Sequence, residues 1–137
     1  MEIWKKVLGG AYEVSSLGNV RSCDRVGADG RRWRGQPIKL TCNQSHGTYY
    51  FFNASVDGRS MMRRVHILVA EAFLGKRPSG MEVNHKNGNS LHNHASNLEY
   101  KTRKKNAEHA VEHGLMPTKA NGRWRRVWRP ANLPGRR

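Results

Sequence analysis

The sequence predicts an α+β fold: an N-terminal antiparallel β-hairpin lobe, followed by a module in which strand, loop, strand and helix succeed one another. In the first half, short runs rich in aromatic and branched residues are separated by glycine-containing turns, as is typical of hairpins. In the second half, a polar loop lies between two strand-like runs, and a helix start signal follows directly. We therefore divide the 137 residues into a β-rich region at 1–64, a second module at 65–114 and a basic tail at 115–137.

The N-terminal region contains two hairpin signals. Residues 12–22 alternate like a strand, turn at Leu17-Gly18-Asn19 and return. Residues 48–64 form a longer strand-like run that is interrupted by Asp57-Gly58, a strong signal for a tight hairpin turn. The two signals predict two antiparallel strand pairs in this region.

Two helices are predicted in the second module. Residues 65–74, VHILVAEAFL, are apolar nearly all round and are followed by Gly75, so we expect a largely buried helix. His66 at its start is expected to be a core residue rather than a ligand. Thr102 is a good N-cap for a second helix from residue 103 to about 113.

The second helix has a predicted inner face. Ala107, Ala110 and Val111 recur at helical spacing, and Asn106 falls on the same side of the helix. A strand–loop–strand–helix unit could bring the first turn of this helix close to the strand end at His85.

The charge of the chain indicates a polyanionic partner. Lys and Arg outnumber Asp and Glu by 25 to 10, which gives a net charge of +15. Repulsion among these charges opposes compaction unless an anion offsets it, and phosphate backbones are the usual anion. We predict double-stranded DNA as the partner; RNA fits the charge equally well, and a merely soluble basic protein is the simplest alternative. Membrane docking or spanning is disfavoured, because no basic amphipathic helix and no apolar run of roughly 20 residues is found.

Basic residues gather in three places that we expect to contact DNA. A solvated charged face is the alternative for each group, and the tail could act as a short arm or be disordered. The candidates are Arg21, Arg25, Arg31, Arg32 and Arg34 around the first turns, Arg103, Lys104 and Lys105 at the second helix, and Arg123, Arg125 and Arg126 in the tail.

The chain has two cysteines, Cys23 and Cys42, too few for a four-ligand zinc site. One disulfide between them is an alternative to two free thiols. Because the sequence shows no signal peptide, we expect a cytoplasmic protein with both thiols free.

Residues 82–106, EVNHKNGNSLHNHASNLEYKTRKKN, contain the parts of a phosphodiester-cutting site. His85 is a candidate general base, since a neutral imidazole accepts a proton near physiological pH. The amide oxygens of Asn84 and Asn106 are candidate ligands for Mg²⁺, Mn²⁺ or another divalent cation, because hard cations prefer oxygen. Asn97 could orient the imidazole by a hydrogen bond. The alternative is a turn-rich loop whose asparagines bond only to local backbone.

Residues 65–106 resemble the HNH endonuclease module of phage-type homing and free-standing endonucleases, through VHILVAEAF, VNHKNGN and NHASNLEY. Residues 4–22, which include YEVSSLGNVRS, resemble the DNA-binding motif that commonly precedes this module. The resemblance implies a ββα-metal (His-Me finger) unit in which His85 activates water, Asn97 braces the site and Asn106 binds one divalent ion.

The resemblance also implies what the protein does. We expect a metal-dependent endonuclease that nicks or cleaves double-stranded DNA, encoded by a phage, monomeric and without an obligate protein partner. Many relatives carry Asp where this chain has Asn84, and a neutral amide attracts a dication less than a carboxylate does. A DNA-binding protein with a degenerate, weakly active or inactive nuclease fold is therefore the alternative. Only about 23 residues follow Gly114, so recognition is expected to rest on the N-terminal hairpins, with modest sequence specificity.

Overall fold

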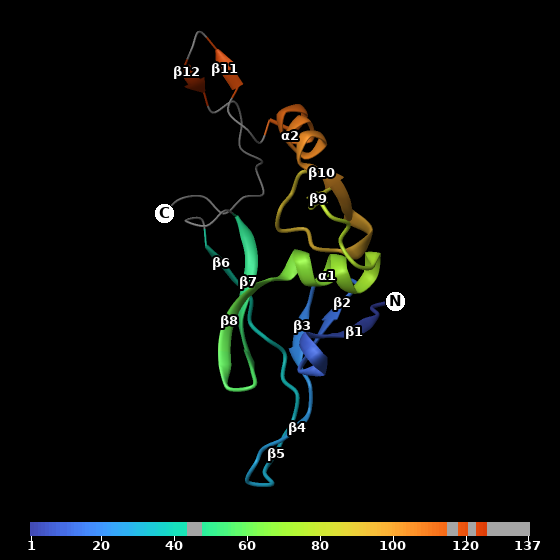
Figure 1. Cartoon of the computed structure of the whole chain (residues 1–137), viewed down its shortest axis with the longest axis vertical. Helices are drawn as coiled ribbons and strands as arrows, with labels where there is room; N and C mark the ends of the chain where they lie inside the picture. The colour runs from blue at the N-terminus through green and yellow to red at the C-terminus, as the bar shows by residue number, and fades with distance from the viewer. Residues whose placement is uncertain (44–47, 115–117, 121–122, 126–137) are drawn as a thin grey trace.

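The computed structural model describes residues 1–43, 48–114, 118–120 and 123–125. Among these residues, the chain forms antiparallel sheets and two α-helices (Figure 1). The helices are α1 (Val65–Leu74) and α2 (Arg103–Glu112), with the short 3-10 helices η1 (Leu8–Gly10) and η2 (Ala95–Asn97). The predicted α+β fold is confirmed.

The strands that pair are neighbours in the sequence. Sheets of three strands are formed by β1 (Trp4–Val7), β2 (Tyr12–Ser15) and β3 (Val20–Ser22), and by β6 (Thr41–Asn43), β7 (Tyr49–Val56) and β8 (Arg59–Arg64). Two-stranded pairs are formed by β4 (Arg25–Val26) with β5 (Arg32–Trp33), β9 (Met81–His85) with β10 (Leu98–Thr102), and β11 (Thr118–Ala120) with β12 (Arg123–Arg125). Both predicted hairpins, at 12–22 and 48–64, are present as β2–β3 and β7–β8.

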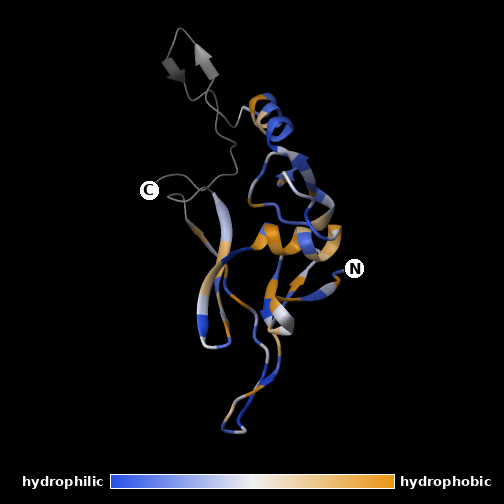
Figure 2. Cartoon of the chain, viewed as in Figure 1, coloured by the Kyte–Doolittle hydropathy of each residue, from blue (hydrophilic) through white to orange (hydrophobic). Residues whose placement is uncertain are grey.

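Helix α1 lies at the centre of the packing and contacts both three-stranded sheets and β10. Figure 2 shows it as a largely hydrophobic helix. Val65 and Val69 have no exposed surface, which stabilises the fold by about 1.5–3 kcal/mol for each side chain. The core that forms around α1 consists of Tyr12, Val14, Val20, Phe52, Ala54, Val65, Leu68, Val69, Ala70 and Leu98. This core contains residues from both sides of position 64. The division of the chain into two regions at that position remains a prediction.

The two three-stranded sheets are also joined by Tyr12 on β2. Its ring packs at 5.3 Å from that of Phe52 on β7. Its hydroxyl oxygen accepts a hydrogen bond from the backbone N–H of Ser55 (2.9 Å). A phenol can fill an apolar junction in this way and still satisfy its polar end.

Helix α1 has the predicted bounds, and Gly75 follows it with φ +87°, a conformation that glycine adopts without strain. Helix α2 begins after Thr102, whose side chain accepts a hydrogen bond from the backbone N–H of Lys105 (3.4 Å). The end of α1 and the start of α2 therefore follow the sequence signals.

The predicted inner face of α2 was wrong in part. Val111 is half exposed and Ala107 is exposed, whereas His109 is buried and Asn106 and Ala110 are half-buried. The side of α2 that faces the protein lies against the polar end of β9 and the loop after it, so polar side chains make the contact. Apolar periodicity alone does not identify such a face.

Cys23 and Cys42 are both free and half-buried. Burial raises the pKa of both thiols. No helix in the described part of the chain is long and apolar enough to cross a membrane.

His66 is buried in α1, as expected, and stacks on Tyr49 with ring centroids 4.6 Å apart. Its Nδ1 atom has no hydrogen-bond partner among the described residues. Burial, together with smaller contributions from the neighbouring His85 and Arg64, lowers the pKa of His66 to about 3. His66 is therefore a neutral core residue at physiological pH.

His66→Phe should make the protein less sensitive to acid. As pH falls from the usual histidine pKa of 6.5 towards 3, the unfolded chain protonates His66 while the folded chain does not, so folding stability is lost. Between pH 7 and pH 5 the wild type should lose about 2 kcal/mol more than the variant. Chemical denaturation at both pH values measures the difference, and equal losses would contradict the buried neutral state.

Candidate active site

A pocket of about 460 Å³ lies between the β9–β10 pair and α2. It brings together residues from β9, from the loop after β9 and from the first two turns of α2. Its lining consists of Tyr49, Glu82, Val83, Asn84, His85, Gly88, Ser90, Arg103, Asn106, Ala107, His109 and Ala110. Three of the four predicted site residues, Asn84, His85 and Asn106, thus meet in one pocket.

His85 is the last residue of β9 and is only 7% exposed. Its Nε2 lies 2.9 Å from Oδ1 of Asn93. Because a carbonyl oxygen can only accept, the imidazole carries its proton on Nε2 and keeps the lone pair on Nδ1. Burial lowers the pKa of His85, the Asn93 contact opposes this, and His92 lowers it further. The ring is thereby held neutral, in one tautomer.

The structure assigns Asn93, and not Asn97, to the hydrogen bond with His85. This contact corrects the expectation that Asn97 holds the imidazole. Both asparagines are buried in the same stretch of chain, and the path of the loop decides which amide reaches the ring. The sequence contains no signal that separates Asn93 from the other asparagines of this loop.

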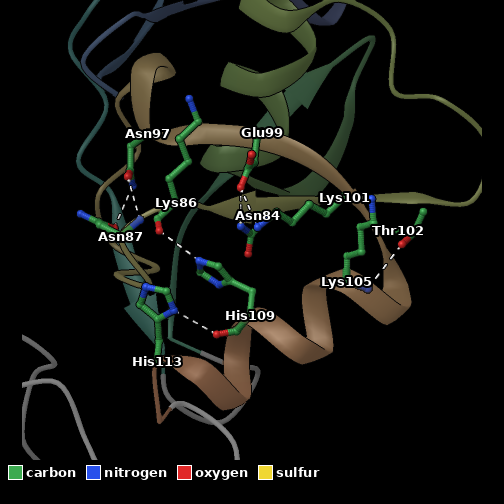
Figure 3. Close-up of polar contacts among 10 residues, drawn as sticks. All are labelled: Asn84, Lys86, Asn87, Asn97, Glu99, Lys101, Thr102, Lys105, His109 and His113. Atoms are coloured by element: carbon green, nitrogen blue, oxygen red, sulfur yellow. Dashed lines mark hydrogen bonds and ion pairs between the residues drawn. The ribbon is translucent and has the colours of Figure 1, made fainter.

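Asn97 holds the loop between β9 and β10 instead (Figure 3). Its Oδ1 accepts from the Asn87 backbone N–H (3.1 Å), and its Nδ2 donates to Asn87 Oδ1 (3.0 Å) and to the His92 carbonyl (2.9 Å). The backbone N–H of Lys86 donates to the Asn97 carbonyl (2.8 Å). Asn97 therefore ties both arms of the loop together just beyond His85.

The two amides proposed as metal ligands are each oriented by a carboxylate. Asn84 Nδ2 donates to Glu99 Oε1 (3.0 Å) across the β9–β10 pair, and Asn106 Nδ2 donates to Glu82 Oε2 (3.0 Å). Figure 3 shows the Asn84 nitrogen towards Glu99 and its oxygen on the side of α2. Both amide oxygens are thus left available to a ligand.

This arrangement of a histidine at a strand end, a loop and a following helix matches known proteins. Residues 63–108 match the HNH endonuclease family, and residues 2–53 match the NUMOD4 motif. This chain belongs to the HNH endonuclease family. The family resemblance and the ββα architecture that the sequence predicts are confirmed.

Two relatives show the extent of the similarity of this HNH protein. The uncharacterized HNH endonuclease L245 of Acanthamoeba polyphaga mimivirus is 34% identical over 113 residues, which are 82% of this chain and 31% of that protein. The DNA endonuclease I-HmuI of Bacillus phage SP01 is 30% identical over 115 residues, 82% of this chain and 60% of that protein. The chain therefore spans about a third of one relative and less than two thirds of the other.

A solved structure supports the same assignment. The structure described as DNA binding and cleavage by the HNH homing endonuclease I-HmuI superposes with a TM-score of 0.68 and 29% identity, and covers 85% of this chain and 62% of that chain. The similarity therefore extends over the N-terminal sheets as well as over the HNH module.

The donor atoms around the pocket fit a hard divalent cation. Within the described ranges, no group of three His, Cys, Asp or Glu side chains converges to hold a metal ion. The pocket instead offers the amide oxygens of Asn84 and Asn106 beside the Glu82 carboxylate. Oxygen donors from few side chains, completed by phosphate and water, suit Mg²⁺ and Mn²⁺. Asn84 and Asn106 are the residues that would hold the ion.

His109 on α2 is a residue of the HNH site that sequence analysis missed. It is 8% exposed and lines the pocket. Its Nε2–H donates to the Lys86 carbonyl (3.0 Å), next to His85, and His113 stacks on it at 4.0 Å (Figure 3). The signal that could have found it is its position three residues after Asn106, on the same side of the helix.

The basic residues predicted to contact DNA fall into separate groups. Arg21 forms an ion pair with Glu13 (2.6 Å) and lies over the Trp4 ring (4.0 Å), so it supports the first sheet. The remaining predicted arginines of the N-terminal region, Arg25, Arg31, Arg32 and Arg34, are exposed on and beside β4–β5, at the end of the molecule opposite α2 in Figure 1.

The structure describes the side chains of the basic group at α2 but not those of the basic group in the tail. Arg103, Lys104 and Lys105 are exposed on the first turn of α2, and Arg103 lines the pocket. The side chains of Arg123 and Arg125 and the whole of Arg126 lie outside the described residues. All of these DNA contacts remain predictions.

Asn97→Ala should loosen the loop of the HNH module. It removes the three side-chain hydrogen bonds that Asn97 makes to Asn87 and to the His92 carbonyl, and each such bond contributes about 0.5–1.5 kcal/mol. We expect a loss of roughly 2–4 kcal/mol in the free energy of unfolding. Asn89→Ala is the control, since the half-buried Asn89 side chain accepts a single hydrogen bond from Leu91 N–H in the same loop. A similar small loss for both variants would contradict the bracing role.

Proposed function

We propose that this chain is a divalent-metal-dependent endonuclease that hydrolyses phosphodiester bonds of double-stranded DNA, with His85 as the general base. The observation that carries the proposal is the buried, neutral imidazole of His85, whose Nε2–H is held by Asn93 while the ring lines a polar pocket. A base needs such a fixed lone pair near the reacting water.

The residues of the pocket suggest the course of the reaction. Nδ1 of His85 accepts a proton from water as the water oxygen forms a bond to phosphorus. The bond from phosphorus to the leaving sugar oxygen breaks, and that oxygen takes a proton from solvent. A divalent cation, when bound by Asn84 and Asn106, supplies charge stabilisation at the scissile phosphate and the leaving oxygen.

The start of α2 supports a polyanionic substrate. Its first turn carries Arg103, Lys104 and Lys105 and no acidic residue, although the positive end of the helix dipole disfavours cations there. A phosphate group at this end would offset both the dipole and the side-chain charges. Because Arg103 also lines the pocket, we place the scissile strand across the first turn of α2.

The N-terminal sheets would then contact the DNA at some distance from the bond that is cleaved. The exposed arginines of the β4–β5 hairpin lie far along the molecule from α2 (Figure 1). A duplex that contacts both would run along the long axis of the protein. Such backbone contacts give affinity that falls with salt and confer little sequence information.

A DNA-binding protein with a degenerate nuclease fold is the second candidate. One observation favours it: residue 84 is a neutral asparagine, and its NH₂ group donates a hydrogen bond to Glu99. That pairing also explains why an amide is tolerated there. A carboxylate at 84 would lie against the Glu99 carboxylate, and two such charges at hydrogen-bond distance repel.

His85→Ala tests the assignment of the base. General base catalysis contributes about 10²–10⁴-fold, so nicking of supercoiled plasmid in Mg²⁺ or Mn²⁺ should fall by at least about 100-fold, with DNA affinity retained. His94→Ala, which removes a histidine of the same loop outside the pocket, is the control. Equal cleavage by wild type and His85→Ala would rule out His85 as the base; no cleavage by wild type with several divalent ions would favour the degenerate fold.

Metal binding can be tested by two compensating substitutions in the Asn84–Glu99 pair. Asn84→Asp alone should bind Mn²⁺ little better than wild type, because the new carboxylate is repelled by Glu99. Asn84→Asp combined with Glu99→Gln should bind about tenfold more tightly, since a charged ligand is added without repulsion. Calorimetric Mn²⁺ titration measures this, with Glu99→Gln alone as control. If the single Asn84→Asp variant gains as much as the double variant, Glu99 does not set the choice of ligand.

A further inference from the structure

The N-terminal sheet touches the loop of the active site through the turn between β2 and β3. The backbone N–H of Ala95 donates to the Ser16 carbonyl (2.8 Å). At Gly18, a Cβ atom would lie 2.9 Å from Asn93 Cβ and 3.0 Å from the Asn93 carbonyl oxygen. Side-chain contacts under 3.0 Å are not tolerated without movement, so the turn can approach Asn93 this closely because residue 18 is glycine.

Asn93 is the residue whose Oδ1 accepts the hydrogen bond from His85 Nε2 (2.9 Å). It is 3% exposed, and its Nδ2 has no hydrogen-bond partner among the described residues. With its amide nitrogen unpaired, the amide is not locked by hydrogen bonds at both ends. The placement of Oδ1 therefore depends on the backbone and packing of Asn93, which the Ser16–Gly18 turn contacts directly.

We propose that the Ser16–Gly18 turn of the N-terminal sheet is a positioning element of the active site, which holds Asn93 so that Asn93 fixes the orientation and tautomer of His85. The inference rests on the proposed role of His85 as the base. The N-terminal motif would thus serve catalysis directly, besides any contact that it makes with DNA.

If the Ser16–Gly18 turn is pushed away from Asn93, the mechanism predicts a specific change in the state of His85. If Asn93 moves, Nε2 of His85 loses its acceptor, and the neutral ring divides between its two tautomers. Nδ1 is then protonated for part of the time and cannot accept a proton from water. Misplacement of a group that supports a catalytic residue costs about 10–100-fold in rate.

Gly18→Ala provides the test and Gly10→Ala the matched control. Both glycines lie in the N-terminal sheet region with similar positive φ angles, +86° and +90°, so alanine strains the backbone about equally. A Cβ at Gly10 meets nothing within 4 Å, whereas a Cβ at Gly18 meets Asn93. The difference between the variants therefore isolates the contact with Asn93.

Three measurements are made on the full chain. Single-turnover cleavage of bound plasmid should be about 10–100-fold slower for Gly18→Ala than for Gly10→Ala. DNA affinity, measured without metal, should be the same for both. The ¹⁵N chemical shifts of the His85 ring, recorded on metal-free protein at a pH of about 8.5 where histidine is neutral, should show the Nε2–H tautomer in wild type and Gly10→Ala and a mixture in Gly18→Ala.

Asn93 variants keep the inference testable if Gly18→Ala does not fold. Asn93→Ala removes the acceptor and should reproduce the slow cleavage and the mixed tautomer. Asn93→Asp keeps an acceptor oxygen and replaces only the unpaired nitrogen, so it should restore the Nε2–H tautomer and most of the rate at the same pH of about 8.5.

Two results would overturn the inference while leaving the proposed function in place. One is that Gly18→Ala cleaves as fast as Gly10→Ala. The other is that Asn93→Ala retains the wild-type tautomer and rate. If wild type itself does not cleave, the proposed function fails; the ring ¹⁵N shifts then still decide whether the turn and Asn93 position His85.

Discussion

Burial of α1 is the constraint on which the rest of the structure depends. A helix that is apolar on almost every side must be covered on several sides at once, so more than one layer has to meet on it. Val65 and Val69 are fully buried where the N-terminal sheets and β10 converge. The β9–β10 pair is thereby fixed against the first sheet, which places the loop of the active site beside the β2–β3 turn.

The polar chemistry of the site is arranged around that packing. In this strongly basic chain, Glu82 and Glu99 accept hydrogen bonds from the amides of Asn106 and Asn84. In the proposed metal site, the carboxylates would fix the geometry of the amides, and the amides would present their oxygens to the cation. Phosphate would then have to supply much of the attraction for the cation, because its direct ligands are neutral.

Local signals in the sequence predict much of the fold. These signals act over only a few residues, so the elements that they delimit could be found without knowledge of the tertiary structure. Examples are Gly75 after α1, the Thr102 cap of α2 and the Asp57-Gly58 turn. β1 and β6 were not predicted, because short edge strands are defined by pairing with a neighbour rather than by their own pattern. The inner face of α2 was misjudged because it packs on a polar loop.

By itself the sequence determined the family, the order of the strand, loop, strand and helix, and the identity of Asn84, His85 and Asn106 as residues of one site. These follow from motif and spacing, which are properties of the chain as written. Only the tertiary structure decided that Asn93 rather than Asn97 meets the imidazole and that Gly18 touches Asn93. The first contact depends on the path of the loop after β9, and the second depends on how the first sheet packs beside that loop. No local pattern in the sequence encodes either distance.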